Sequence, residues 1–215
     1  MKMKHLLKTL ESEQDRRFRD LLGEKVWARL PCAIRRRFGK RLTGGSSVTY
    51  QGQVVSMRMS AAGWLITQLV RLVGSPLPYD MSSAGQPAVV VVTEDPQSEG
   101  QFWVRQYGRK HGFPQVVHSS KRFCGPTGLE EYIGYGIGMA LTVEGTEDAL
   151  YFKSAGYFLQ VKGRKLRLPN WLTPGALIIG HHDMGDSNFM FSLRLSHPVL
   201  GEMIAQDCIF QDAQE

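Results

Sequence analysis

The stretch ALIIGHHDMGDSNFMFSLRLS, residues 176–196, contains the pattern of a complete β-hairpin. Two runs rich in apolar, β-branched and aromatic residues flank the segment MGDS, which has the composition of a tight turn. Side chains alternate across a strand, so His181 and Asp183 share one face of the first run while His182 occupies the other. The stretch therefore predicts two antiparallel strands with one face of each directed into a core.

The segment HHDMGD within this hairpin is dense in metal-ligand residue types. Because its histidines point to opposite faces, at most two of His181, His182 and Asp183 can reach one ion, whereas a catalytic zinc takes three protein ligands. His197 lies about one strand length from the turn and is a poor third ligand. With Asp183 opposite Asn188, we expect His182 to face the aromatic residues of the second run. We therefore expect a polar hairpin tip, with no metal and no other cofactor.

The same strand pattern recurs from residue 87 onward. Short apolar runs alternate with turn segments such as EDPQSEG, EGTED and KGRK. No helical pattern of 10–15 residues lies between them, which disfavours a doubly wound parallel sheet. We expect an antiparallel sheet of about seven to nine strands after residue 75. The expected strands are Ala88–Thr93, Phe102–Tyr107, Gln115–His118, Glu130–Val143, Leu150–Gln160, Ala176–Asp183, Phe189–Ser196 and Met203–Phe210.

The front of the chain has helical patterns. A capping-box-like start near Ser12 predicts a first helix that ends at Gly23, and a second helix runs from Pro31 to Gly39. A strand follows at 48–59, with a bulge near Gly52. The fold class we predict is α+β, with N-terminal helices packed on a strongly curved antiparallel β-sheet, half-barrel or barrel-like. Residues 1–16 form an extension and 17–215 a single domain, divided into a helical front (17–75) and a sheet (87–212).

GWLITQLVRLVGSP, residues 63–76, is the strongest helical segment. Apolar residues cover nearly all sides of the helix from Trp64 to Val73, and Gly74 and Pro76 end it. Such a helix is normally buried, here as a plug in the curved sheet. The alternative is a helix that dips into a membrane surface or lids a lipid cavity.

Composition and charge limit the class of protein. Hydrophobic residues make up 42% of the 215 residues and charged residues 21%, which is typical of a globular domain. Three scattered cysteines predict no disulfide framework, and the lack of a signal-peptide pattern or an apolar span favours a cytoplasmic location. The net charge is +9 in residues 1–60 and −3 in the remainder. The positive charge of the first part is centred on Arg35–Arg37. This basic region is either a solvated helix end or a surface for phosphate groups; without interleaved aromatics, nucleic acid is disfavoured.

Three glycines with a spacing of two residues stand out at Gly134, Gly136 and Gly138 in EEYIGYGIGMALTVEG. On a continuous strand they share one face and leave it bare. Close packing of the 64–73 helix, strong coiling of the sheet or contact with a flat ligand would each use that space. The segment is not a dinucleotide-binding loop, because no helix follows it.

The segment FWVRQY places Trp103, Arg105 and Tyr107 on one face of a strand. An arginine between two core-facing aromatics needs a carboxylate partner, and Glu131 on a later strand is the candidate. The pair is either a structural ion pair or part of a site in which Arg105 binds a ligand carboxylate or phosphate. The sequence lacks the phosphate-loop, nucleophile-elbow and zinc-protease motifs that would indicate a common enzyme class.

Several motifs in order resemble a bacterial family. They are FRDLLG (18–23), W-x-x-LP followed by RRRF (27–38), Y-x-G (50–52), GSPLP (74–78), W-x-R-x-Y (103–107), E-x-x-G (131–134), LP-x-WL-x-P (168–174) and HP-x-x-G (197–201). The family they resemble is known only as domain of unknown function 4166. Its members occur alone or behind a saccharopine-dehydrogenase-like oxidoreductase domain. The resemblance implies that any shared site contains Trp103, Arg105, Glu131 and His197.

Three classes of function follow. The first is a binding or accessory module that holds an apolar or amphipathic small molecule against Trp103, Arg105, Tyr107, Glu131, Gly134, Gly136, Gly138 and His197. The second is an enzyme that acts on such a ligand through Arg105 and Glu131. The third is an interaction module whose basic helical end docks a partner oxidoreductase or an anionic membrane. The sequence does not predict the ligand or the oligomeric state.

Overall fold

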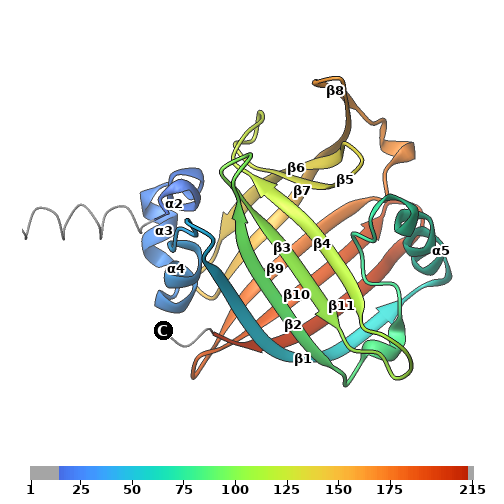
Figure 1. The fold of residues 1–215 in the computed structure, drawn as a ribbon, viewed down its shortest axis with the longest axis horizontal. Coiled ribbons are helices and arrows are strands. Elements are labelled where there is room, and N and C mark those ends of the chain that lie inside the picture. Colours follow the sequence, from blue (N-terminus) through green and yellow to red (C-terminus); the bar gives the residue numbers. More distant parts are fainter. Residues whose placement is uncertain (1–14, 213–215) are drawn as a thin grey trace, which may run out of the picture.

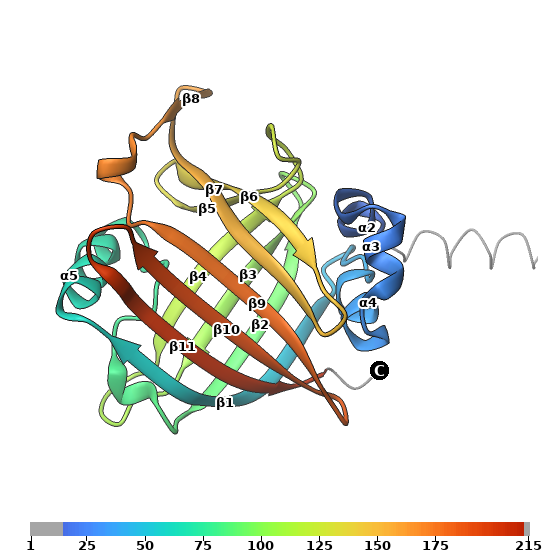
Figure 2. The ribbon, with the colours of Figure 1, turned by 180° about the vertical axis from the view of Figure 1, so that it is seen from behind.

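The computed structural model describes residues 15–212, which form a closed antiparallel β-barrel of ten strands (Figures 1 and 2). Consecutive strands pair as neighbours, and the first strand pairs with the last to close the barrel. Strand β8 (Arg164–Arg167) pairs only with the end of β7 and projects away from the wall. The barrel strands are β1 (Ser47–Met59), β2 (Pro87–Asp95), β3 (Gly100–Tyr107), β4 (Gln115–Arg122), β5 (Glu130–Gly134), β6 (Ile137–Gly145), β7 (Ala149–Val161), β9 (Ala176–Gly185), β10 (Asn188–His197) and β11 (Gly201–Gln211).

The predicted barrel-like curvature is confirmed, but the α+β class is wrong. Strands hold 51% of the structure and helices 19%. In a closed barrel the inward side chains of one wall pack against those of the opposite wall, so helices are needed only at the ends. Short helices occupy those ends instead of covering a sheet face (Figures 1 and 2).

One end carries α2 (Arg17–Leu22), α3 (Glu24–Arg29) and α4 (Cys32–Phe38). Phe18 of α2 and Phe38 of α4 insert into the core, with ring centroids 5.2 Å apart in an edge-to-face arrangement. The second and third of these helices adjoin at Leu30–Pro31, and α4 matches the helix predicted between Pro31 and Gly39. Helix α3 was not predicted from the sequence, and the start predicted for the first helix near Ser12 lies outside the described residues.

The opposite end carries α5 (Ala61–Val70) and the 3₁₀ turn η1 (Arg71–Val73). Ser60 caps α5 by accepting a hydrogen bond from the amide of Gly63, and Gly74 ends the segment with a φ of 112°. The remaining 3₁₀ turns are η2 (Met81–Ser83) and η3 (Asn170–Leu172). Among residues 15–212, no helix has the length and apolar character needed to cross a membrane.

The prediction that the 64–73 helix is buried is wrong. Trp64 is 53% exposed and Leu72 79% exposed, whereas Ile66 and Val70 pack against the core. The helix covers the barrel end with one narrow face, so most of its apolar surface meets solvent. The exposed position is compatible with the alternative, a helix at a membrane surface or over a lipid cavity, which stays a prediction.

Two corrections concern register. The strand predicted over 130–143 is interrupted at Tyr135 and Gly136, whose φ angles of 50° and 78° form the turn between β5 and β6. The extra strand and β8 bring the described strands after residue 75 to ten, above the predicted range. The second correction concerns the opening hairpin: a bulge between Asn188 and Phe189 shifts its pairing by one residue. His181, and not His182, therefore faces the aromatic interior.

Candidate functional site

The barrel interior contains an apolar cavity near the α5 end. It encloses about 680 Å³ of empty space, including the part open to solvent. Its walls are mostly apolar, with Val117, Met139, Ile179, Phe191 and Leu195 among the lining residues. Val70 of α5, the segment Pro76–Pro78 and Pro174 also line it, so the connections at the α5 end frame its mouth.

The cavity floor is a buried polar cluster of Arg105, Ser119, Lys121 and Glu131. Glu131 Oε1 accepts hydrogen bonds from Ser119 Oγ at 2.5 Å and from Lys121 Nζ at 3.0 Å. Arg105 Nη1 donates to Ser119 Oγ at 3.4 Å, and Arg105 Nη2 lies 3.9 Å from Glu131 Oε1. Strands β3, β4 and β5 are consecutive neighbours, which brings these residues together from three segments of the chain.

The cluster carries more positive than negative charge. Burial raises the pKa of Glu131, but Lys121, Arg105 and the hydrogen bond from Ser119 together outweigh burial and lower the pKa, so the carboxyl stays ionised. For Lys121, burial and Arg105 lower the pKa while Glu131 raises it, and the net direction is down. Two basic side chains share one carboxylate in a region that excludes water. Arg105 keeps its charge when buried, so an additional anion beside it would be stabilised.

Two groups of the cluster have unused hydrogen-bonding capacity. Glu131 Oε2 is buried without a hydrogen-bond partner within residues 15–212. In the same part of the chain, the guanidinium of Arg105 makes one hydrogen bond, to Ser119, although it has five N–H donors. Because Arg105 and Glu131 both line the cavity, these groups are available to a molecule inside it.

His181 lies in an aromatic layer between the polar cluster and the barrel end that carries α2–α4. Five rings have centroids within 6.0 Å of the imidazole, those of Phe38, Trp103, Phe152, Phe189 and Phe191. Burial lowers the pKa of His181 well below 6.5, and the nearby cations Arg37, Lys121 and Arg105 lower it further. The neutral ring fills the barrel between the apolar cavity and the helical end.

His182 points the other way, as the alternation predicts. Its Nε2 lies 3.0 Å from Ser192 Oγ, and Tyr151 packs against its ring edge-to-face. Within the described residues, no group of three His, Cys, Asp or Glu side chains is arranged to hold a metal ion.

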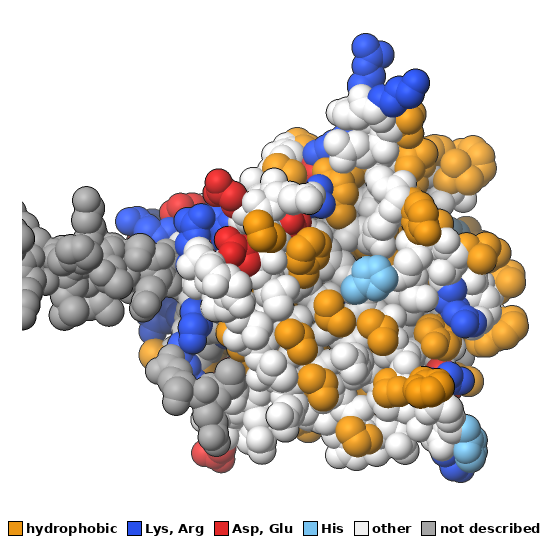
Figure 3. Space-filling model, in the orientation of Figure 1, with side chains coloured by type: hydrophobic (Ala, Val, Ile, Leu, Met, Phe, Trp, Pro, Cys, Tyr) orange, Lys and Arg blue, Asp and Glu red, His pale blue; other side chains and the backbone are white. Residues whose placement is uncertain are grey.

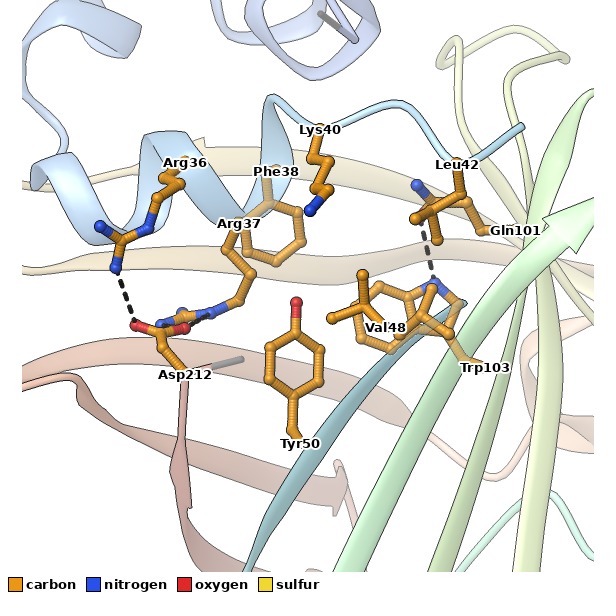
Figure 4. A pocket seen from close by; sticks show the side chains of 11 residues that line it. Arg36, Arg37, Phe38, Lys40, Leu42, Val48, Tyr50, Gln101, Trp103 and Asp212 are labelled. Carbon is orange, nitrogen blue, oxygen red and sulfur yellow. Dashed lines mark hydrogen bonds and ion pairs between the residues drawn. The ribbon is translucent and has the colours of Figure 1, made fainter. Parts of the chain in front are cut away.

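A second, basic pocket lies beside α4 (Figure 4). It encloses about 600 Å³ including its open part, and Arg36, Arg37 and Lys40 line it with Asp212. The side chain of Arg37 is buried. Its Nη2 lies 2.6 Å from Asp212 Oδ1, and its guanidinium lies 3.7 Å from the centroid of the Phe189 ring. The Tyr50 hydroxyl points into the same pocket, and burial raises its pKa to about 12. The Arg37–Asp212 pair links α4 to the residue that follows β11 and so helps to close this barrel end.

The structure brings together part of the predicted site: Arg105, Tyr107, Glu131 and Gly138 line the apolar cavity, whereas Trp103 lines the basic pocket. Trp103, Arg105 and Tyr107 point into the barrel from β3, as the alternation predicted, and Glu131 meets Arg105 from β5. His197 does not line either cavity described above; its Nδ1 accepts a hydrogen bond from the Val199 amide in the β10–β11 turn. The basic helical end lies at the opposite barrel end from the apolar cavity.

The three glycines have separate roles, because β5 ends at Gly134. A Cβ at Gly134 would lie 2.9 Å from the Val73 carbonyl oxygen, and one at Gly136 2.3 Å from that of Gln160. Gly138 lines the cavity, where a Cβ would meet the Phe158 ring at 2.7 Å. The first two permit close backbone approach, and only Gly138 is placed to contact a ligand.

Sequence reasoning missed Lys121 and Ser119. In QVVHSSKR the alternation puts Val117, Ser119 and Lys121 on one face of β4, so the pattern was present. A lysine near a polar strand end is normally solvated, and nothing local indicates that this one is buried with 1% exposure.

Comparison with known proteins gives one match. A family model described as "Domain of unknown function (DUF4166)" matches residues 30–210. No curated protein and no solved structure matches the chain.

Proposed function

The chain belongs to the family described as a domain of unknown function (DUF4166), and from its barrel interior we propose that it binds one amphipathic small molecule. The observation that carries the proposal is the apolar lining of the cavity around an arginine at its floor that uses one of its five donors. Ligand sites commonly combine apolar walls with a few convergent polar groups, as this cavity does. The ligand is an apolar chain or ring system that bears one small oxygen head group.

The charge of the cluster selects the head group. Arg105 and Lys121 outnumber Glu131, so a carboxylate beside Arg105 would neutralise the interior. A hydrogen bond between arginine and a carboxylate is charge-assisted and is about twice as strong as a neutral one. We therefore assign a monocarboxylate with an apolar tail as the preferred ligand class.

The state of Glu131 favours binding over catalysis. A general base that works near neutral pH needs a pKa near 7, whereas the pKa of Glu131 is lowered. Its Oε1 is also held by Ser119 and Lys121. A carboxylate fixed in this way suits a structural part of a binding site better than a group that exchanges protons.

Calorimetric titration with decanoic acid and decan-1-ol tests the proposal. The two probes share a chain length, and only the acid carries a charge. We expect both to bind, the acid more tightly, and Arg105→Met to weaken the acid by roughly 10- to 150-fold, equivalent to about 1.5–3 kcal/mol. Arg58→Met serves as the matched control, because Arg58 is a largely exposed arginine on β1.

Two results would contradict the proposal. If neither probe binds the purified full-length chain, the cavity is not a ligand site. If the acid binds with the same affinity to the Arg105→Met variant, the head group does not lie at Arg105. Thermal melts of both variants without ligand show whether each is folded at the temperature of the titration.

A further inference from the structure

We propose that the α5 end of the barrel docks onto an anionic phospholipid bilayer, so that the mouth of the apolar cavity opens at the membrane surface. The docking rim consists of three segments: α5 with η1, the arm 161–172 that contains β8 and η3, and the turn 198–200 between β10 and β11. The idea that a ligand passes between the bilayer and the cavity rests on the proposed function. The docking itself rests on the surface of this end alone.

The topology gathers the exposed apolar residues at one end. In an antiparallel barrel that follows sequence order, alternate connections lie at the same end, and α5 shares its end with the arm and with the turn 198–200 (Figures 1 and 2). Fourteen large hydrophobic side chains of the described residues are more than half exposed. All but Val55 and Met184 belong to connections at the α5 end. Such a concentration is unusual for a surface that meets only water.

The arm supplies apolar and basic side chains together. Trp171 is 77% exposed, and Leu166 and Leu172 are each more than half exposed. The sequence of the arm, VKGRKLRLPNWL, contains four Lys or Arg residues and no Asp or Glu. Figure 3 shows this mixture as orange and blue side chains on the arm, above the apolar edge formed near α5. Tryptophan is enriched at membrane interfaces, and basic residues beside it attract anionic headgroups.

Helix α5 supplies a second apolar surface. Leu69, like Trp64, is more than half exposed, and Leu72 in η1 has the most exposed of the large hydrophobic side chains in this segment. Its ten residues are too few to span a bilayer but suffice to lie in the headgroup region. In the turn between β10 and β11, Val199 is 85% exposed and lies at the same end.

The docking rim also frames the cavity. Val70 at the end of α5 lines the apolar cavity, and so does Pro174, two residues beyond η3. Each side of the docking rim is packed on the barrel: Gly74 lies close to the carbonyl of Ile133 in β5, and Gly175 lies close to that of Ser196 in β10. A bilayer that contacts the docking rim would therefore lie next to the opening.

Charge favours an anionic bilayer over a protein partner. The docking rim contains five Lys or Arg residues and no Asp or Glu, and one of the five, Lys165, pairs with Glu130. The α2–α4 end is also basic, but within the described residues none of its three helices carries a large hydrophobic side chain among the exposed ones. That end can attract anions without inserting, whereas the α5 end has both features that peripheral membrane binding requires.

Flotation with vesicles tests the inference on the full-length chain without added ligand. Vesicles of phosphatidylcholine alone are compared with vesicles that also contain phosphatidylglycerol. We expect binding to the mixed vesicles and weakening by added salt, since exposed charges are screened. The variant Arg164→Gln/Arg167→Gln should bind about 30-fold more weakly, at about fivefold for each basic residue. The control Lys25→Gln/Arg29→Gln removes two exposed charges from α3 and should bind within about twofold of the parent.

A second variant pair tests the apolar part. Leu72→Ser/Trp171→Ser should reduce binding at least about tenfold, because both side chains insert, while Val55→Ser on the barrel wall should not. No binding to mixed vesicles, or equal loss in the α3 control, would overturn the inference. A concentration-dependent dimer that binds no vesicles would also overturn it, by assigning the docking rim to a second copy of the chain.

The two proposals fail separately. The Leu72→Ser/Trp171→Ser variant should still bind decanoic acid in the absence of vesicles, because neither residue lines the cavity. The Arg105→Met variant should still bind mixed vesicles, because Arg105 is buried in the barrel.

Discussion

Replacing His181 with phenylalanine should change how the free energy of unfolding responds to acid. The imidazole is 4% exposed, and its Nδ1 has no hydrogen-bond partner within residues 15–212. Burial among aromatic rings lowers its pKa well below 6.5, and three cations (Arg37, Lys121 and Arg105) lower it further. Phenylalanine preserves the aromatic layer and removes the titrating group.

The size of the effect follows from one proton. In the folded barrel His181 remains neutral, whereas the unfolded chain takes up a proton as the pH falls through about 6.5. The folded state is therefore not penalised at pH values above the pKa of the unfolded chain. Below that pKa, proton uptake by the unfolded chain lowers the free energy of unfolding. The slope approaches about 1.4 kcal/mol per pH unit, which accumulates to about 2 kcal/mol by about pH 5.

Urea titrations of the parent and His181→Phe, repeated from about pH 7.5 to about pH 5, measure this loss. All other titrating groups are common to both proteins, so the difference between the two curves isolates His181. We expect the variant to gain about 2 kcal/mol relative to the parent across this range. His182→Gln should give a smaller difference of the same sign, since the His182 pKa is also lowered by burial but Asp148 and Asp207 raise it. A His181→Phe difference that stays flat within about 0.5 kcal/mol would refute the reasoning.

Two further predictions concern stability. In thermal and urea unfolding, Glu131→Leu should cost about 3–5 kcal/mol because it leaves two buried cations, whereas Arg105→Met should cost less than about 1 kcal/mol because Lys121 still pairs with the carboxylate. Equal losses in the two variants would contradict this. Gly136→Ala should destabilise by about 1–3 kcal/mol more than Gly163→Ala in the same assay: both residues have a φ near 79°, but only Gly136 has a carbonyl oxygen in the path of the new Cβ. Equal losses would show that backbone conformation alone matters.

Local patterns predicted most of the wall of the barrel but not its closure. Alternating apolar residues placed the hairpin of β9 and β10 and the inward face of β3, because side-chain direction depends only on neighbours in sequence. Closure depends on the pairing of Gly52 with Phe210, which no local signal encodes. The helices were therefore predicted to cover the inner face of the sheet, but in the closed barrel that face packs against the opposite wall.

The site was predicted only in part, because local patterns do not determine which strands become neighbours. The sequence supplied Arg105 and a carboxylate partner, Glu131, and the structure confirms that they are close. It could not supply the closer partner, Lys121, since burial of a lysine depends on which strands become neighbours. The one-residue bulge after Asn188, which turns His181 inward, likewise depends on the cross-strand pairing.

The pairing of β1 with β11 also has a consequence for synthesis on the ribosome. Strand β1 emerges early, yet one of its edges remains without its partner until the last strand leaves the exit tunnel. During that interval the nascent chain presents an unpaired edge, which is prone to pair with other chains. A chain that ends before Gly201 would keep that open edge permanently. Premature termination in the last part of the gene should therefore produce aggregates, not a smaller folded barrel.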